Sequence, residues 1–289
     1  MQEGFNAELN CTFFFCENLK NVTLSTSLKN VDKEIFYNSG YVLENTSPYE
    51  IKDNTFVMYN GEIKGKKNDC LDEATGTFYI PKGITRIAIG AFKDKKNIKK
   101  IVMPNSITEI GESAFDGCEN LSEIKLSENL CKIGQSAFSN CTSLKEIFIP
   151  KSVTDICKYA FCKCNSLKCV YILENVNNIE ENAFFLCSNL EQIIVDTNNK
   201  KYSSGFGALF DKEKKTILET PCILQDDFEI PESVNTIGNN CFTGCINLES
   251  VTIPNSITQF NNCVFTGCND IENVSVVEDL AENQEKSKY

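Results

Sequence analysis

Cysteine has the most reactive side chain in this sequence and occurs 16 times, whereas histidine is absent from all 289 residues. Without imidazole, Ser-His and Cys-His nucleophiles and histidine-ligated metal sites are excluded. The densest cysteine group is Cys157, Cys162, Cys164 and Cys169. Its C-x4-C-x-C-x4-C spacing is not a usual zinc arrangement, and no Cys-x-x-Cys pair indicates thioredoxin-like redox chemistry.

Carboxylates are plentiful, but Glu109, Glu112, Glu180 and Glu181 occupy variable positions typical of solvated surface. No glycine-rich phosphate loop or nucleophile elbow occurs. The sequence therefore predicts no enzyme: no catalytic residue, no metal and no cofactor. The net charge of −12 disfavours nucleic acid and anionic membranes as partners. One basic stretch, 93–100, is predicted to be solvated surface, with binding to an anionic partner as the alternative.

The sequence contains a repeat of 23 residues, and this repeat must position any binding site. "ITEIGESAFDGCENLSEIKL" (107–126) is followed by "LCKIGQSAFSNCTSLKEIFI" (130–149), 23 positions later. One phenylalanine marks nine units in the same register, interrupted twice: Phe13, Phe36, Phe92, Phe115, Phe138, Phe161, Phe184, Phe242 and Phe265. Self-similarity at such a period indicates a solenoid, in which each unit buries its apolar face against its neighbours.

The sequence of each unit predicts the same short strands and turn. In the unit around Phe161, "LKEIFIP" (144–150) alternates like a strand and stops at proline, and "SVTDI" (152–156) offers a second short strand. The segment 157–164 has the spacing of one helical or 3₁₀ turn. Equivalent strands of adjacent units are expected about 4.8 Å apart.

Two insertions of similar length and sequence interrupt the array, at about 45–77 and 197–228. Asn60-Gly61 in the first is a hairpin-turn signal between alternating apolar residues. We therefore predict two β-hairpins that bud from one solenoid over residues 1–276, followed by a polar tail at 277–289.

The pattern IPxSVTxIGxxAFxxCxxLxxI, present at 149–170 and 230–251, resembles the BspA-like leucine-rich repeat family, which includes the Treponema pallidum type of repeat. The resemblance covers roughly residues 9–276. It implies a right-handed, curved leucine-rich repeat solenoid of about nine 23-residue units, with short parallel strands on the concave face. It also implies a surface protein of bacteria or anaerobic protists that acts in adhesion.

Seven cysteines follow the marker phenylalanine by three residues, one in each of seven units. We predict that they are small buried side chains or weak donors to the turn backbone. Disulfides between units are the alternative. They are disfavoured because equivalent side chains point the same way, so that the Cβ vectors do not converge.

The concave face carries the best candidate site. The residues just after the buried strand isoleucine include Val102, Lys125, Phe148, Tyr171 and Ile194. The last three are apolar in successive units, whereas later units have Thr252 and Ser275. We predict that these five residues bind a partner. Two alternatives stay open for the apolar three: cover by the second insertion, or no role.

The sequence thus favours a non-enzymatic, adhesin-like module that binds a host or cell-surface protein through its concave face. A cytosolic scaffold, or a spacer that associates end to end with itself, is the alternative function. The chain opens "MQEGFNAELN", which lacks the features of a signal peptide, and no apolar run is long enough to insert in a membrane. These absences predict a cytoplasmic location, and the family resemblance predicts the cell surface.

Overall fold

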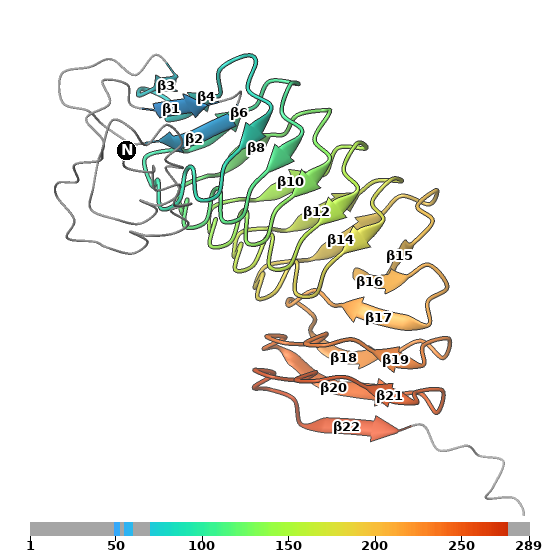
Figure 1. Cartoon of the computed structure of the whole chain (residues 1–289). Coiled ribbons are helices and arrows are strands. Elements are labelled where there is room, and N and C mark those ends of the chain that lie inside the picture. The colour runs from blue at the N-terminus through green and yellow to red at the C-terminus, as the bar shows by residue number, and fades with distance from the viewer. Residues whose placement is uncertain (1–48, 53–54, 60–69, 277–289) are drawn as a thin grey trace, which may run out of the picture.

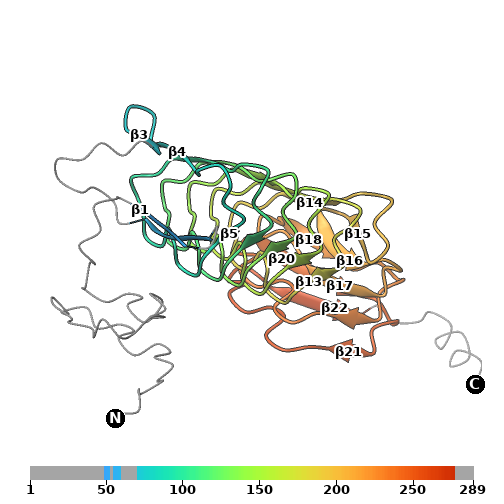
Figure 2. The same ribbon diagram turned by 45° about the horizontal axis from the view of Figure 1, so that its top comes forward.

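The computed structural model describes residues 49–52, 55–59 and 70–276, in which there are 22 strands and no helix. The strands stack turn upon turn into a curved β-solenoid (Figure 1, Figure 2). The units of Phe13 and Phe36, the Asn60-Gly61 turn and the 277–289 tail lie outside the described residues.

The longer strand of each unit lies on the concave face. These strands are β4 (Thr77–Tyr79), β6 (Lys100–Val102), β8 (Glu123–Lys125), β10 (Glu146–Phe148), β12 (Cys169–Ile172), β14 (Gln192–Val195), β18 (Asp226–Glu229), β20 (Leu248–Ile253) and β22 (Asn273–Val276). They form three parallel runs, β4-β6-β8, β10-β12-β14 and β18-β20-β22, and Ile147 pairs with Val170 at an offset of 23 residues. The repeat therefore sets the strand register directly.

The second strand of each unit is only two residues long. These strands are β5 (Arg86–Ile87), β7 (Glu109–Ile110), β9 (Lys132–Ile133), β11 (Asp155–Ile156), β13 (Asn178–Ile179), β19 (Thr236–Ile237) and β21 (Gln259–Phe260). Strands β5, β7, β9, β11 and β13 pair in unbroken order. The predicted strand in "SVTDI" is confirmed at β11.

The predicted helical turn at 157–164 is wrong, because two residues in it adopt left-handed backbone angles. Tyr159 has φ 59° and Lys163 has φ 57°, so the segment forms successive turns. The N–H of Phe161 donates to the Ala183 carbonyl of the next unit at 2.8 Å. The turns thus join neighbouring units as the strands do.

The core is a column of phenylalanines, as predicted. Phe92, Phe115, Phe138, Phe161 and Phe184 are at most 1% exposed. Their rings stack with centroids 5.0, 5.1, 5.3 and 5.6 Å apart. Phe78 meets the first ring edge-on at 5.0 Å. Both arrangements are favourable for aromatic quadrupoles.

Both insertions form antiparallel pairs that rejoin the solenoid. In the first, β1 (Tyr49–Lys52) pairs with β2 (Thr55–Tyr59), and β3 (Leu71–Asp72) pairs with β4. In the second, β15 (Tyr202–Gly205), β16 (Ala208–Asp211) and β17 (Thr216–Glu219) form a three-stranded meander. Strands β2 and β17 each continue, in parallel, into the short-strand sheets through β5 and β19.

The second insertion divides the core into two clusters. Leu209 packs with the core that precedes it, whereas Ala208 and Phe210 on the other face of β16 pack with the core that follows. This alternation is the ordinary period of a strand. Strand β16 therefore packs with one hydrophobic cluster on each of its two faces.

Glu219, on β17 of the second insertion, takes the place of a missing backbone acceptor for the amide of Phe184. The marker phenylalanines 92, 115, 138 and 161 donate their N–H to an alanine carbonyl 22 residues later. At Phe184 the insertion occupies that place, and the amide donates to the Glu219 carboxyl. Burial raises the pKa of this carboxyl to about 8. The thiols of Cys187, Cys222 and Cys241 lie near it.

Replacing Phe138 by alanine should lower the free energy of unfolding by roughly 3–5 kcal/mol, because it leaves a cavity in the ring column. Phe148→Ala is the matched control, since this ring is 60% exposed and its loss should cost less than about 1 kcal/mol. Urea unfolding of both variants measures the difference. Equal effects would show that the ring column is not the core.

Glu219 should make stability depend on pH. Its pKa is raised on folding, from 4.5 to about 8. Between pH 4.5 and pH 8 the folded state therefore holds one proton more than the unfolded state. The free energy of unfolding falls as pH rises over this range, and the stabilisation is lost once pH has risen through 8. Relative to Glu219→Gln, the wild type should lose on the order of 3–5 kcal/mol between pH 4.5 and pH 9. A constant difference between the two unfolding curves would contradict the assignment.

Candidate protein-binding surface

The predicted site residues lie in one row along the concave strands. Val102 is paired with Lys125 in β6 and β8, and Phe148, Tyr171 and Ile194 are paired in turn in β10, β12 and β14. Lys125 and Phe148 are exposed, whereas the other three are half-buried. The row is therefore made of two groups, one on each side of the step from β8 to β10.

Phe148 and Tyr171 form a stacked pair that faces solvent. Their ring centroids are 4.9 Å apart with an interplanar angle of 6°. Phe148 is 60% exposed, which is high for an aromatic residue on a strand. Ile194 extends the pair by one strand. Polar or weakly polar neighbours, Glu146, Cys169 and Gln192, occupy the parallel row beside it.

The second insertion docks at the edge of this sheet. The Ile193 N–H donates to the Gly207 carbonyl at 2.8 Å, and the Val195 N–H donates to Ser204 Oγ at 3.1 Å. The insertion thus gives partners to β14, the last strand of that sheet. Phe148, two strands away, stays open to solvent.

The concave sheet is interrupted between β8 and β10. In the described part of the chain, one sheet ends at β8 and another begins at β10, although β9 pairs with both of its neighbours on the other side. Ile124 is half-buried, whereas its equivalents Ile101, Ile147 and Val170 are at most 1% exposed. The units therefore separate only on the concave side.

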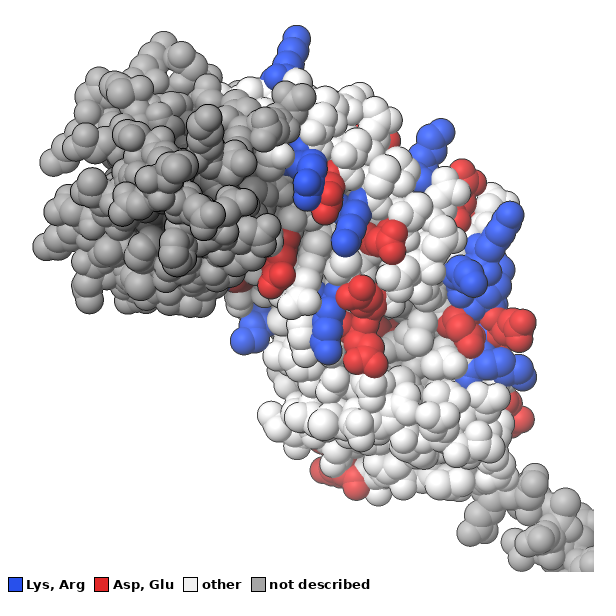
Figure 3. Space-filling model, viewed as in Figure 1, with Lys and Arg blue, Asp and Glu red and all other residues white. Residues whose placement is uncertain are grey.

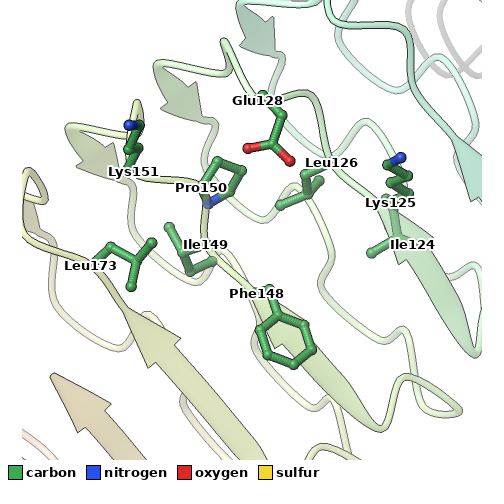
Figure 4. Close-up of a pocket in the computed structure, with 9 residues that line it drawn as sticks. All are labelled: Ile124, Lys125, Leu126, Glu128, Phe148, Ile149, Pro150, Lys151 and Leu173. Carbon is green, nitrogen blue, oxygen red and sulfur yellow. The ribbon is translucent and has the colours of Figure 1, made fainter. Parts of the chain in front are cut away.

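A cavity of about 360 Å³ lies at this interruption (Figure 4). This volume is at the small end of ligand sites. Its lining is mainly apolar, and Lys125, Glu128 and Lys151 carry charges around it. The lining residues are Ile124, Lys125, Leu126, Glu128, Phe148, Ile149, Pro150, Lys151 and Leu173. Lys125 and Phe148, both predicted from sequence, thus lie on the lining of one cavity.

Surface charges pair along the solenoid axis, so that blue and red side chains lie beside each other in Figure 3. Each of six ion pairs in the described residues joins positions 23 apart. They are Arg86–Glu109, Lys93–Asp116, Lys96–Glu119, Lys100–Glu123, Lys158–Glu181 and Lys168–Glu191. The basic stretch at 93–100 is thereby countered by acids of the next unit, which weakens the alternative of an anionic partner.

The exposed aromatic residues that sequence reasoning missed include Tyr79 and Phe206. Tyr79 is 51% exposed and is paired with Val102, so it belongs to the same row one unit earlier. The 23-residue period, counted back from Val102, identifies Tyr79 as the equivalent residue of the preceding unit. Phe206 is 71% exposed, at φ 53°, in the turn between β15 and β16. Its only signal was the neighbouring glycines in "GFG".

The ladder cysteines act as hydrogen-bond donors to the backbone. Each buried thiol in a consecutive run of units donates to the carbonyl of a marker phenylalanine 26 residues earlier, at Sγ–O distances of 3.0–3.2 Å. These thiols belong to Cys118, Cys141, Cys164 and Cys187. Burial raises the pKa of the Cys118 thiol to about 12. The thiols are therefore protonated near neutral pH and poor nucleophiles.

The cluster around Cys164 is not arranged as a ligand set. Cys157, Cys162 and Cys164 are buried, and Cys169 is half-buried on the concave strand β12. Within the described ranges, no group of three or more cysteine, aspartate or glutamate side chains is placed to hold a metal ion. These same ranges include no helix long and apolar enough to span a membrane.

Stacked 23-residue units, with parallel strands on a concave face, define a leucine-rich repeat solenoid. The chain belongs to the BspA type leucine rich repeat family, whose sequence profile matches residues 8–61, 76–207 and 220–287 in six copies. This match confirms the resemblance seen in the repeat pattern. No curated protein matches the chain.

Solved structures share the fold. A leucine-rich repeat protein from Eubacterium ventriosum is 24% identical with a TM-score of 0.61, over 71% of this chain and 60% of the other. The pneumococcal vaccine antigen PcpA is 22% identical with a TM-score of 0.64, over 78% and 67%. A leucine-rich repeat protein from Bacteroides ovatus is 23% identical with a TM-score of 0.50, over 81% and 70%. The chain thus spans less than two thirds of the Eubacterium protein.

Thiol labelling should separate two classes of cysteine. In the native protein, Cys131 and Cys263 should react first with iodoacetamide, because among the 14 described cysteines these two are exposed. After denaturation without reductant, most of the 16 should be labelled. Peptide mass spectrometry reads both steps. A majority protected as disulfides would contradict the donor role of the buried thiols.

Proposed function

We propose that this protein is a non-enzymatic binding module that captures a protein partner through its concave face. The observation that carries the proposal is the exposed stacked pair of Phe148 and Tyr171, extended by Ile194. Val102 and Lys125 continue the same row in the preceding units.

The chemistry of this row suits a protein surface. Aromatic anchors with a polar rim are typical of interface hot spots, and exposed apolar patches usually mark partner sites. Burial of the rings contributes about 25 cal/mol per Å² of apolar area before ordering costs are subtracted. A rigid strand also places the rings with little further loss of entropy. The row therefore supports recognition of a folded or extended protein, rather than catalysis.

We further propose that the role is adhesin-like, with a host or cell-surface protein as partner and the cell surface as the location. The expectation comes from the family, and the solved neighbour PcpA is itself a vaccine antigen. A cytoplasmic scaffold is the competing assignment. Surface labelling of intact cells distinguishes the two locations.

Self-association of the solenoid is a second candidate function. Val274 and Val276 on β22 are 51% and 59% exposed, and Phe260 on β21 is 51% exposed. These strands are the last described members of their sheets. If copies associate through them, the mass measured by light scattering should rise with concentration, and Val274→Lys with Val276→Lys should abolish the rise.

The triple change Phe148→Thr, Tyr171→Thr and Ile194→Thr should weaken partner capture about 10- to 100-fold. The fold should survive, because Thr252 occupies the equivalent position in β20. Pull-down from surface extracts, followed by quantitative mass spectrometry and titration of the captured protein, measures the effect.

The matched control changes three exposed residues on the short strands: Arg86→Thr, Lys132→Thr and Asn178→Thr. This variant should bind as the wild type does. Equal binding by the wild type and the concave triple variant would move the site off this row. Thermal unfolding of the triple variant well below that of the control would show that the row is part of the core.

A further inference from the structure

Backbone groups are left without their usual partners at the interruption between β8 and β10. At equivalent positions, Met103 N–H donates to Lys125 O at 3.1 Å and Ile149 N–H donates to Tyr171 O at 3.3 Å. Leu126 makes no such bond to Phe148, although it is only 5% exposed. A buried N–H without a partner is costly, so this edge favours a ligand that can accept.

The facing edge of β10 has the same deficiency. Glu123 N–H donates to Lys99 O at 3.3 Å, and Gln192 N–H donates to Lys168 O at 3.1 Å. The equivalent amide of Glu146 makes no such bond to the Ser122 carbonyl, and Cys169 in the paired strand β12 lacks it too. We call the space between these two edges, together with the cavity, the β8–β10 slot. Two strand edges thus face one another with free main-chain groups.

The sequence departs from the repeat at the same place. Ser127 stands where neighbouring units have Pro104 and Pro150. Around the slot the rest of the solenoid stays closed: β9 is paired on both sides, and Phe115 and Phe138 stack at 5.1 Å. The slot is therefore a local opening in a rigid frame, and its two edges are held in place.

We propose that the β8–β10 slot binds an extended segment of the partner protein as an added strand. Its main chain accepts from the amides of Leu126 and Glu146, and one apolar side chain fills the 360 Å³ cavity beside Phe148. Strand addition of this kind obtains affinity from backbone hydrogen bonds and specificity from side-chain pockets. The inference rests on the proposed protein-binding function and specifies its partner's chemistry.

The charges around the slot specify the flanks of the segment. Lys125 and Lys151 are both exposed, and neither forms an ion pair with another described residue. Glu128 is the single acid among the residues that line the cavity, which leaves this lining with net positive charge, whereas Glu123 and Glu146 lie on the strand edges of the slot. A segment with an acidic residue next to its apolar anchor therefore matches this lining.

A synthetic peptide with the sequence 189–197, NLEQIIVDT, is a suitable probe, because it has β-branched residues between two acids. It carries fluorescein and blocked termini, and its binding to the full chain is followed by anisotropy. The wild type should bind it with a Kd below about 1 mM. Lys125→Glu with Lys151→Glu should weaken binding at least about tenfold, whereas Lys82→Glu with Lys132→Glu, away from the slot, should not.

Hydrogen exchange supplies the second measurement. Saturating peptide should slow exchange of the Leu126 and Glu146 amides, and a peptide with Ile194→Pro, which lacks an N–H, should bind more weakly. The strand-addition proposal would be overturned if the peptide did not bind the wild type at about 1 mM. It would also be overturned if the Lys125→Glu, Lys151→Glu variant bound the peptide as tightly as the Lys82→Glu, Lys132→Glu control. If capture of the natural partner still depends on Phe148, Tyr171 and Ile194, the proposed function stands and only the slot inference fails.

Discussion

The structure depends on one repeated hydrogen bond, in which a marker phenylalanine donates its amide to an alanine of the next unit. The distances from Phe92, Phe115, Phe138 and Phe161 are 2.7, 2.8, 2.7 and 2.8 Å. A constant period of 23 residues keeps this bond, the ring stack and the thiol donors in register together. Unit length is therefore invariant along each stack, and extra residues are accommodated only as strands that rejoin a sheet. At Phe184, where this bond is absent, the amide donates to the Glu219 carboxyl instead.

Much of this could be predicted from sequence, because a period states which residues are equivalent. The buried phenylalanine column and the strand pairing follow from equivalence alone, and so does the position of Tyr79. The role of Glu219 could not be predicted, because it depends on how one insertion folds back against a particular amide. The sharing of β16 between two cores has the same origin.

The candidate site divides in the same way. The row of Phe148, Tyr171 and Ile194 was visible as three apolar residues at one repeat position. The cavity beside it was not, because periodicity fixes register but not the separation of two units. Only the half-buried state of Ile124 and the missing backbone bonds reveal the opening. Ser127 in place of proline was the available signal, and one substitution does not specify an opening. The solenoid therefore combines a closed outer side with a concave side that is open between β8 and β10.

Amide hydrogen exchange at single-residue resolution in the free protein tests this account most directly. The account predicts that Leu126 and Glu146 exchange at least about tenfold faster than Met103 and Gln192, their equivalents in paired strands. Phe115 and Phe138, whose amides join units on the closed side, should remain protected. Uniform protection across all four strand amides would show that β8 and β10 are paired in solution, and would contradict the opening on which the binding proposal rests.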